Sequence, residues 1–280
     1  DVSNDDIVRL MVGRELQNRF NAMKENVSNL AHETVFEVRN VTSRDRKKVR
    51  DISFSVCRGE ILGFAGLVGS GRTELMNCLF GVDKRAGGEI RLNGKDISPR
   101  SPLDAVKKGM AYITESRRDN GFFPNFSIAQ NMAISRSLKD GGYKGAMGLF
   151  HEVDEQRTAE NQRELLALKC HSVNQNITEL SGGNQQKVLI SKWLCCCPEV
   201  IIFDEPTRGI DVGAKAEIYK VMRQLADDGK VILMVSSELP EIITVCDRIA
   251  VFCEGRLTQI LTNRDDMSEE EIMAWALPQE

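Results

Sequence analysis

The sequence predicts an α/β fold with a mixed, largely parallel sheet, an N-terminal antiparallel β region and a small helical lobe. Short β-type segments separated by charged turns run from Val35 to Ala65 and predict the antiparallel region. Apolar runs alternate with helical patterns from Ser181 to Phe252, as in parallel sheets with crossover helices. Between them, Asp154 to Lys169 has apolar positions at helical spacing among charges, which is typical of a lobe helix packed on one side.

The individual elements follow from this pattern and from the residues that begin and end them. Ser101-Pro102 begins a helix and Gly109 ends it, because proline suits the first helical position and glycine the position after the last. Residues from about 127 to 180 are expected to be mostly helical. We expect strands at Val35–Val38, Ile52–Val56, Ile61–Ala65, Gly88–Leu92 with the turn Asn93-Gly94, Met110–Thr114, Val200–Phe203, Val231–Val235 and Ile249–Phe252, and helices at Glu74–Phe80, Ser181–Cys195 and Ala214–Ala226.

Composition narrows the classes of function. The chain has 280 residues and a formal net charge of −4, which gives no broad cationic field and argues against nucleic acid as a partner. No apolar run approaches the ~20 residues that span a bilayer, so any membrane work requires a partner. The start at Asp1, without methionine or leader, predicts a piece of a longer protein. The run Cys195 to Cys197 is interpreted as a small apolar helix end rather than a soft-metal site.

A glycine-rich turn follows the strand Ile61–Ala65 and opens a helix, which is the context of a phosphate-binding loop. Its backbone N–H groups would point at phosphate oxygens, helped by the helix dipole. The Thr73 hydroxyl is a candidate Mg²⁺ ligand, and Arg72 stands where the motif has lysine. A glycine turn without a ligand is the alternative. The candidate nucleotide-binding residues are Gly66, Gly69, Ser70, Gly71, Arg72 and Thr73.

Two carboxylates end the apolar strand Val200–Phe203, at the sheet edge where ligand sites open. Phosphoryl transfer needs a residue that orients Mg²⁺ and one that polarises the attacking water. We assign these tasks to Asp204 and to Glu205, the candidate catalytic residue. A solvated acidic strand end is the alternative.

Ser181-Gly182-Gly183-Asn184, called the signature turn below, begins a helix and taken alone is only a helix start. Following a phosphate loop and preceding the acidic strand, it resembles the signature of ABC transporter ATPases, and the resemblance covers Val35 to Glu280. It implies a P-loop NTPase core, the cofactors ATP and Mg²⁺, and head-to-tail pairs of domains. In such pairs the signature turn of one domain closes over nucleotide bound to the other, and Asp211 lies in the intervening D-loop.

The stretch from Asp5 to Leu16 is similar to the join after the first domain in tandem monosaccharide importer ATPases of the ribose, galactose, xylose and arabinose type. That resemblance implies that residues 1–33 end a preceding domain and its linker, and the whole chain most resembles importer ATPases for D-allose. Residues 34–280 would form the ATPase domain, with a helical lobe at about 120–180. It also implies three partners, at the cytoplasmic face of the inner membrane: the N-terminal nucleotide-binding half of the same chain, a membrane permease and, indirectly, a periplasmic sugar-binding protein.

Several residues depart from the family pattern, and they gather at one site. Besides Arg72, Glu115 stands where a glutamine usually contacts Mg²⁺, and Ser237 stands at the switch position where a histidine usually senses the γ-phosphate. The stretch Asn40 to Arg50 has no aromatic residue to stack on adenine. The Ser237 hydroxyl cannot supply the charge of an imidazole, and the Glu115 carboxylate adds a negative charge where an amide would be neutral, so we expect slow ATP turnover at the local site. The signature turn is intact, and we expect it to serve the partner domain. Arg72 and Glu115 are expected to pair with each other.

Two questions stay open at this stage. A non-hydrolysing regulatory module is the first rival to an ATP-hydrolysing motor, whereas a soluble ABC protein of DNA repair or translation is disfavoured by the lack of basic surfaces and long coiled-coil arms. Phe122, Phe123 and Phe126 stand where ABC domains receive a permease helix. Contact with a permease and packing inside the domain are equally compatible with the sequence.

Overall fold

The computed structural model describes residues 33–140 and 152–278. The expected join at Asp5 to Leu16 and nearly all of the expected linker lie outside the described residues. Among the described residues, no helix has both the length and the apolar character needed to span a membrane.

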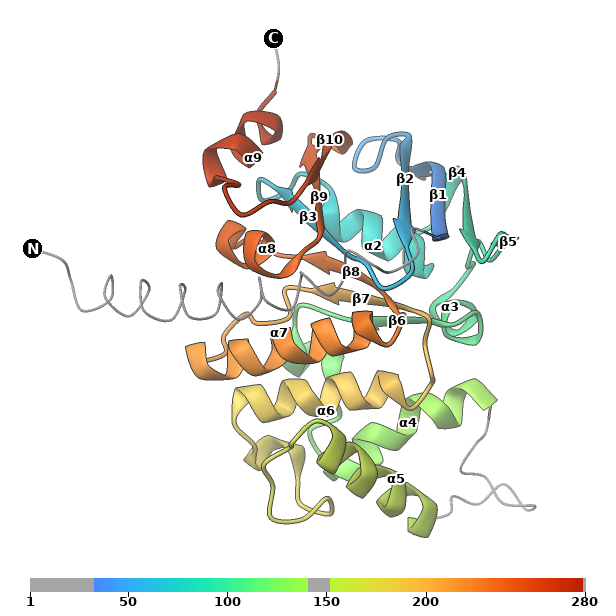
Figure 1. Ribbon diagram of the computed structural model, residues 1–280. Coiled ribbons are helices and arrows are strands. Elements are labelled where there is room, and N and C mark those ends of the chain that lie inside the picture. Colours follow the sequence, from blue (N-terminus) through green and yellow to red (C-terminus); the bar gives the residue numbers. More distant parts are fainter. Residues whose placement is uncertain (1–32, 141–151, 279–280) are drawn as a thin grey trace, which may run out of the picture.

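A six-stranded sheet forms the centre of the molecule (Figure 1). Five of its strands are parallel, and the edge strand β10 (Arg256–Thr262) runs antiparallel to its neighbour. Both faces are buried, since alternate residues of β7 (Val200–Asp204) enter two different hydrophobic clusters. This double burial confirms the expected parallel sheet. In spatial order the strands are β10, β9 (Arg248–Cys253), β3 (Ile61–Gly66), β8 (Val231–Val235), β7 and β6 (Met110–Ile113).

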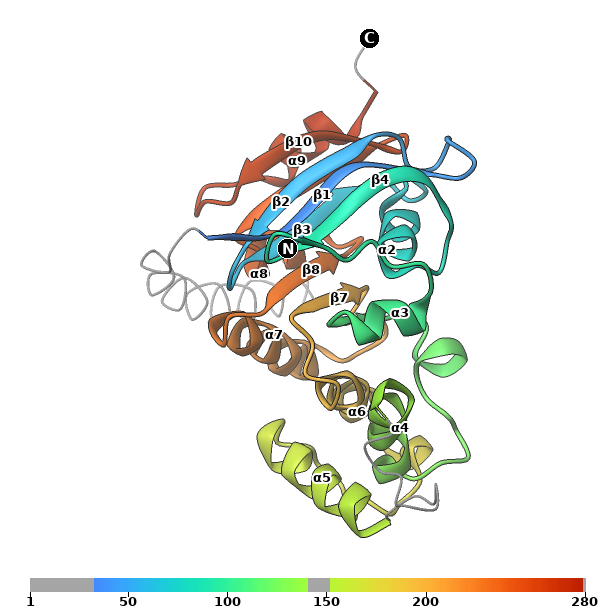
Figure 2. The ribbon, with the colours of Figure 1, turned by 90° about the vertical axis from the view of Figure 1, so that its right-hand side faces the viewer.

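An antiparallel sheet covers one face of the central sheet, as the sequence predicts, and the helix α2 (Arg72–Phe80) packs with both (Figure 2). One hydrophobic cluster joins side chains of both sheets to Leu75, Met76 and Leu79 of this helix. This packing fixes the position of α2 relative to the central strands. The antiparallel strands are, in spatial order, β2 (Ile52–Cys57), β1 (Thr34–Ser43), β4 (Arg85–Leu92) and β5 (Lys95–Asp96).

The opposite face of the central sheet is covered by α7 (Val212–Asp227), α8 (Leu239–Val245) and α9 (Glu269–Ala276). The side chain of Asp211 caps α7 by accepting a hydrogen bond from the backbone N–H of Ala214, 3.0 Å away. Apolar side chains at helical spacing then bury one face of α7 against the sheet. At the sheet's edge, α3 (Pro102–Lys107) begins at Ser101, whose side chain accepts from Asp104 N–H.

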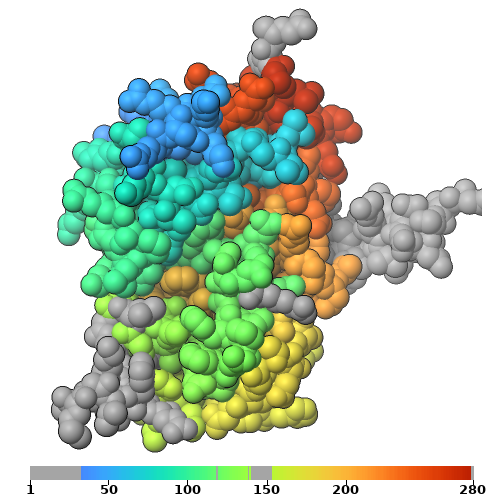
Figure 3. All heavy atoms as spheres, turned by 180° about the vertical axis from the view of Figure 1, so that it is seen from behind, coloured from blue at the N-terminus to red at the C-terminus, as the bar shows by residue number. Residues whose placement is uncertain are grey.

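A separate hydrophobic cluster fills the helical part of the chain, below the sheets in Figure 1. It joins Phe122, Ile128, Ile177 and Val188, which come from segments far apart in the sequence. Figure 3 shows that the residues following β6, drawn in green, lie where the β-rich part meets these helices. The elements here are the π-helical turn η2 (Arg117–Gly121), α4 (Ile128–Asp140), α5 (Glu152–Leu165), the 3₁₀ turn η3 (Ile177–Glu179) and α6 (Gly182–Leu194).

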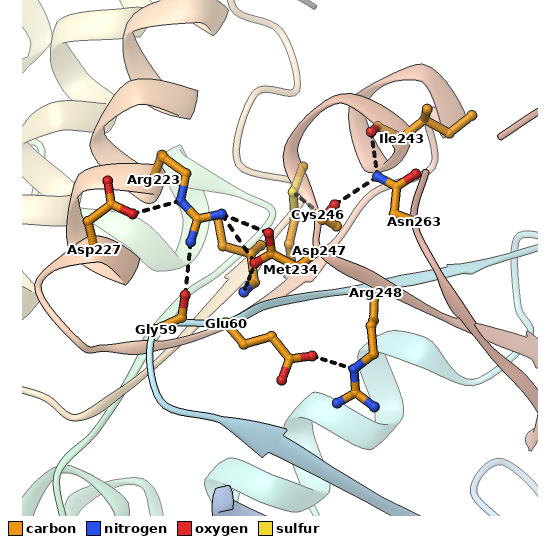
Figure 4. Close-up of polar contacts among 11 residues, drawn as sticks. Gly59, Glu60, Arg223, Asp227, Met234, Ile243, Cys246, Asp247, Arg248 and Asn263 are labelled. Atoms are coloured by element: carbon orange, nitrogen blue, oxygen red, sulfur yellow. Dashed lines mark hydrogen bonds and ion pairs between the residues drawn. The ribbon is translucent and has the colours of Figure 1, made fainter. Parts of the chain in front are cut away.

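A network of charged groups ties α7 to the amino ends of the central strands (Figure 4). Arg223 lies almost fully buried and donates to Asp247 at 2.9 Å and to the carbonyl of Gly59 at 2.9 Å. Asp247 also accepts from the backbone N–H of Ile61 at 2.8 Å. One helix and two strands are thus fixed at the edge opposite the phosphate-binding loop.

The observed fold is the expected α/β class, with a few elements that the sequence pattern did not indicate. The strands and helices expected from periodicity are present to within a few residues. The helices α8 and α9, the edge strand β10 and the π-helical turn η2 were not anticipated. Each of them is short or lacks a regular apolar period, so local pattern gives little signal.

Candidate functional site

The glycine-rich loop lies at the carboxyl end of β3, and its glycines are where other side chains would clash or strain. Gly66 and Gly71 have φ of 149° and 106°, conformations that side chains disfavour. A Cβ on Gly66 would lie 2.5 Å from the Phe252 carbonyl oxygen, and one on Gly71 would lie 2.3 Å from that of Lys48. Around Gly69, by contrast, no described atom lies within 4 Å of an added Cβ. The loop is thus packed at its base and open at its tip.

Thr73 and Asp204 meet at the base of this loop, although they are far apart in the sequence. The Thr73 hydroxyl lies 3.3 Å from an Asp204 carboxylate oxygen, and the Tyr112 hydroxyl donates to the other oxygen at 2.8 Å. Burial raises the pKa of Asp204, and the bonds from Tyr112 and Thr73 oppose that rise. The two predicted Mg²⁺ ligands therefore lie next to each other.

These oxygens suit a magnesium ion by their chemistry. Mg²⁺ prefers carboxylate and hydroxyl oxygens and is held by few protein groups together with phosphates. Ser70 in the same loop has a buried hydroxyl with no hydrogen-bond partner among the described residues, which leaves a polar atom for a ligand. The residues present therefore fit Mg²⁺ and a phosphate.

The Arg72 side chain reaches the end of β8. Its side chain is 7% exposed and donates to the carbonyl of Ser236 at 2.5 Å. Burial lowers the pKa of Arg72, while Glu205 and Asp204 favour its charged form. Its guanidinium group thus carries a positive charge near Asp204 and Glu205, at the carboxyl ends of β7 and β8.

Glu205 and Ser237 are joined across the ends of β7 and β8. The Ser237 hydroxyl lies 3.2 Å from a carboxylate oxygen of Glu205, whose backbone N–H donates to Val235 at 2.9 Å. Glu205 has φ of 49°, a conformation uncommon outside glycine. Burial raises the pKa of Glu205, against the bonds from Ser237, and a carboxylate with a raised pKa is a better base near neutral pH.

Beneath these loops Glu241 joins several segments. Its carboxylate accepts from Thr207 at 2.6 Å, from Ser236 at 2.9 Å and from Lys215 at 2.8 Å. Burial alone would raise the pKa of Glu241, but the ammonium group of Lys215 and hydroxyl groups hold it below its usual value. Glu241 therefore fixes the loop after β7 relative to the loop after β8.

The expected pair of Arg72 with Glu115 is wrong. Glu115 forms an ion pair with Arg208, in the loop after β7, while Arg72 donates to the backbone at Ser236. The reason is the loop after β6, which directs Glu115 toward the outer side of the site, where its side chain is 40% exposed. The third predicted metal ligand is thus engaged elsewhere in this structure.

The signature turn lies at the amino end of α6, with Ser181 exposed at its tip. The Asn184 side chain donates to the Ser181 hydroxyl at 2.9 Å and accepts from the Lys169 N–H at 2.9 Å. An added Cβ on Gly183 would lie 2.5 Å from the Cβ of Ala214, so this glycine permits close contact of α6 with α7. Gly183 therefore has a packing role in addition to the role predicted for it.

The three phenylalanines divide between the two interpretations that the sequence left open. Phe122 is buried in the hydrophobic cluster of the helical part, which supports packing inside the domain. Phe123 and Phe126 stack at 5.2 Å and are 47% and 38% exposed. Contact with a permease stays a prediction for this exposed pair.

Four side chains around the site were not predicted from the sequence, namely Tyr112, Arg117, Arg208 and Glu241. Tyr112 stands in an apolar strand and has the pattern of a core residue. The other three stand in polar stretches, where charge alone marks no role. They lie two, three and four places after Glu115, Glu205 and Ser237, and this closeness to motif residues is the signal that could have singled them out.

Comparison with known proteins places this geometry in a family. The family model described as "ABC transporter" matches residues 49–208, more than half of the chain. The ribose import ATP-binding protein RbsA of Bacillus cereus is 43% identical over 99% of this chain. A putative ribose/galactose/methyl galactoside import ATP-binding protein of Burkholderia lata is 45% identical over 100%. The chain spans about half the length of these relatives, 54% and 53%.

Solved structures agree on the fold. A nucleotide-free ATP-binding cassette from an ABC transporter superposes with a TM-score of 0.74 at 21% identity, covering 88% of this chain and 100% of that one. A dimeric cassette bound to ADP and Pi gives 0.69 at 20% identity, covering 82% and 99%. With the matched family model, these findings lead to one conclusion. The chain belongs to the ABC transporter family and is one of its ATP-binding domains.

Proposed function

We propose that this chain is the second nucleotide-binding domain of an importer ATPase, which couples ATP binding and hydrolysis to uptake of a monosaccharide. The observation that carries the proposal is the convergence of the phosphate loop, Asp204 and Glu205 at one sheet edge, with the signature turn on α6. The names of the relatives support a sugar as cargo. D-allose or a similar sugar is our choice, on the sequence resemblance alone.

Each residue of the site has one task in this proposal. Backbone N–H groups from Gly69 to Thr73 bind the phosphates, and Thr73 and Asp204 hold Mg²⁺. Mg²⁺ would neutralise charge on the phosphates. Glu205 is the group that would accept a proton from the attacking water, and Ser237 orients its carboxylate through the 3.2 Å contact.

The local site turns over slowly in this proposal. A serine in place of an imidazole supplies no positive charge at the γ-phosphate, and Arg72 is occupied by the Ser236 carbonyl. The pairing of Glu115 with Arg208 removes an oxygen from the metal position. The signature turn instead completes the nucleotide site of the N-terminal half of the same tandem chain.

The remaining partners follow from the importer function. A membrane permease docks on the exposed pair Phe123 and Phe126, which places the domain at the cytoplasmic face of the inner membrane. A periplasmic sugar-binding protein acts indirectly, by delivering sugar to the permease.

A regulatory module that binds nucleotide without hydrolysis is the second candidate, favoured by the Arg72 contact with Ser236. ATP turnover separates the two. This chain alone should turn over ATP slowly, whereas the same chain joined to the N-terminal half should be fast, and Ser181→Ala should abolish only the fast activity. Equal turnover of the single chain and the joined protein would contradict the asymmetric roles. The second candidate would be supported if Glu205→Gln changed neither activity.

A further inference from the structure

Arg117 joins two loops that belong to different parts of the molecule. Its guanidinium group donates to the carbonyl of Gly182 at 3.1 Å and to that of Gly209 at 3.0 Å. Gly182 is the first residue of α6, in the signature turn, and Gly209 lies in the loop between Glu205 and Asp211. One planar side chain therefore connects the signature turn to the loop that follows the catalytic strand.

Both glycines lie directly against this guanidinium group. An added Cβ on Gly182 would lie 3.3 Å from a terminal nitrogen of Arg117, and one on Gly209 would lie 3.4 Å from the other. Gly209 also has φ of 66°, which a side chain disfavours. The approach is close because these two positions carry no side chain.

The π-helical turn that bears Arg117 is itself fixed to α6. Lys192, near the far end of α6, donates to the carbonyl of Gly121 at 2.5 Å. A Cβ on Gly121 would lie 2.8 Å from a methyl carbon of Leu189, so the turn packs directly on the helix. At its start, the Ser116 side chain accepts from the Asp119 N–H. These contacts hold the turn against α6 and thereby position Arg117 next to the start of the helix.

A second pair links the same segments. Glu115, two residues before Arg117, pairs with Arg208, the residue before Gly209. The loop after β6 and the loop after β7 are therefore joined at both positions. Together with the bonds of Arg117, this pair connects the loops after β6 and β7 to the signature turn.

The charge of Arg117 lies at the unfavourable end of the helix. The amino end of a helix carries partial positive charge, and a cation there is stabilised when an anion binds alongside. A phosphate brought to the signature turn by a partner domain would supply that anion.

We propose that Arg117 is a positioning residue that holds the signature turn and the loop 208–211 in one geometry for the partner's nucleotide. This inference rests on the proposed function, which assigns the signature turn to the partner site. Arg117 acts through backbone carbonyls, so its loss leaves the local phosphate loop and its Mg²⁺ ligands in place.

The test uses this chain joined to its N-terminal half and compares Arg117→Met, Arg117→Lys and the control Arg264→Met. Arg264 makes exposed ion pairs with Asp266 and Glu271, beside α9. Loss of two charge-assisted hydrogen bonds should lower kcat at least about tenfold in Arg117→Met, with KM for ATP changed less than about twofold. A lysine carries a compact ammonium charge instead of a planar fork, so the kcat of Arg117→Lys should lie between those of wild type and Arg117→Met.

Amide hydrogen exchange on the same variants reports on position rather than activity. Arg117→Met should speed exchange in peptides covering 181–189 and 207–215 and leave peptides of β7 and β8 unchanged. If Arg117→Met had the kcat of wild type, or wild-type exchange rates in both peptides, the inference would be overturned. If Arg117→Met misfolds, as general loss of protection would reveal, the folded Arg117→Lys must show both effects or the inference is overturned.

Ser181→Ala separates this inference from the proposed function. If Ser181→Ala abolishes fast turnover while Arg117→Met leaves it intact, only the role of Arg117 is wrong. If neither variant changes turnover, the trans role of the signature turn is wrong as well. A loss in Arg117→Met without a loss in Ser181→Ala would also overturn the inference, because Arg117 would then act outside the signature turn.

Discussion

Two buried cations, Arg72 and Lys192, donate to backbone carbonyls at 2.5 Å each. A carbonyl offsets less charge than a carboxylate does, so burial dominates and lowers the pKa of both groups. Arginine keeps its proton in proteins, whereas a buried lysine is able to lose its own within the accessible pH range. Lys192, which also supports the turn bearing Arg117, is therefore the group whose environment is measurable by titration.

Stability should rise with pH through the ionisation of Lys192. Burial lowers its pKa from 10.5 to about 8, so the unfolded chain holds this proton more tightly between those values. The folded state is penalised below about pH 8, and the penalty is relieved as the pH rises toward 10.5. The free energy of unfolding of wild type minus that of Lys192→Met should increase by about 3 kcal/mol over this window. Urea unfolding of both proteins at several pH values measures it, and a constant difference would contradict the burial.

Arg72 and Glu115 should contribute independently to nucleotide affinity, since each has another partner. The effects of Arg72→Lys and Glu115→Gln on Mg-ATP binding should add to within about 0.5 kcal/mol in the double variant. A fluorescent ATP analogue displaced by Mg-ATP gives the four affinities. A coupling free energy above about 1 kcal/mol would instead indicate direct contact between Arg72 and Glu115, contrary to the structure.

At the scale of elements, the contact between α6 and α7 depends on one glycine. Gly183→Ala would place two Cβ atoms 2.5 Å apart at Ala214, so we expect a loss of about 1–3 kcal/mol in unfolding free energy. The double variant Gly183→Ala with Ala214→Gly restores the space. It should recover nearly all of the loss, because it only exchanges a glycine and an alanine between the first turns of α6 and α7.

Urea midpoints of these variants check the prediction. Gly87→Ala is a suitable control, because no described atom lies within 4 Å of an added Cβ there. No recovery in the double variant would mean that the two helices do not touch at this point.

Sequence pattern predicted the elements with a strong period and missed the short or irregular ones. Strands such as β7 and β8 are uninterrupted apolar runs, and α7 has a cap and a regular apolar face. By contrast, α8 has only seven residues with a proline near its start, and the exposed and half-buried positions of β10 do not alternate. The π-helical turn η2 depends on contacts with α6, which no local pattern reports.

At the scale of the whole molecule, the site depends on strand order. Motif residues were identifiable from the sequence because glycines and carboxylates follow apolar strands. Their neighbours were not, because Arg72 reaches Ser236, and Glu115 reaches Arg208, only when β3, β8, β7 and β6 lie in that order. Long-range partners of charged residues are set by this arrangement and by side-chain length, so the pairing of Arg72 with Glu115 was wrongly predicted.

The charged network at the opposite edge should support the whole sheet. Arg223→Met would leave the Asp247 carboxylate and the Gly59 carbonyl without their buried partner, and we expect a loss of about 3 kcal/mol in unfolding free energy. Arg264→Met removes only exposed ion pairs and should cost less than about 1 kcal/mol. Urea unfolding compares the two, and equal losses would contradict a structural role for the network.

Calorimetric titration of this chain with Mg-ATP tests the central claim most directly. Wild type should bind, and Thr73→Ala should bind about tenfold more weakly in Mg²⁺ but equally well when EDTA removes the metal, since one ligand of the ion is lost. Absence of any binding heat for wild type, alone and joined to its N-terminal half, would contradict the account.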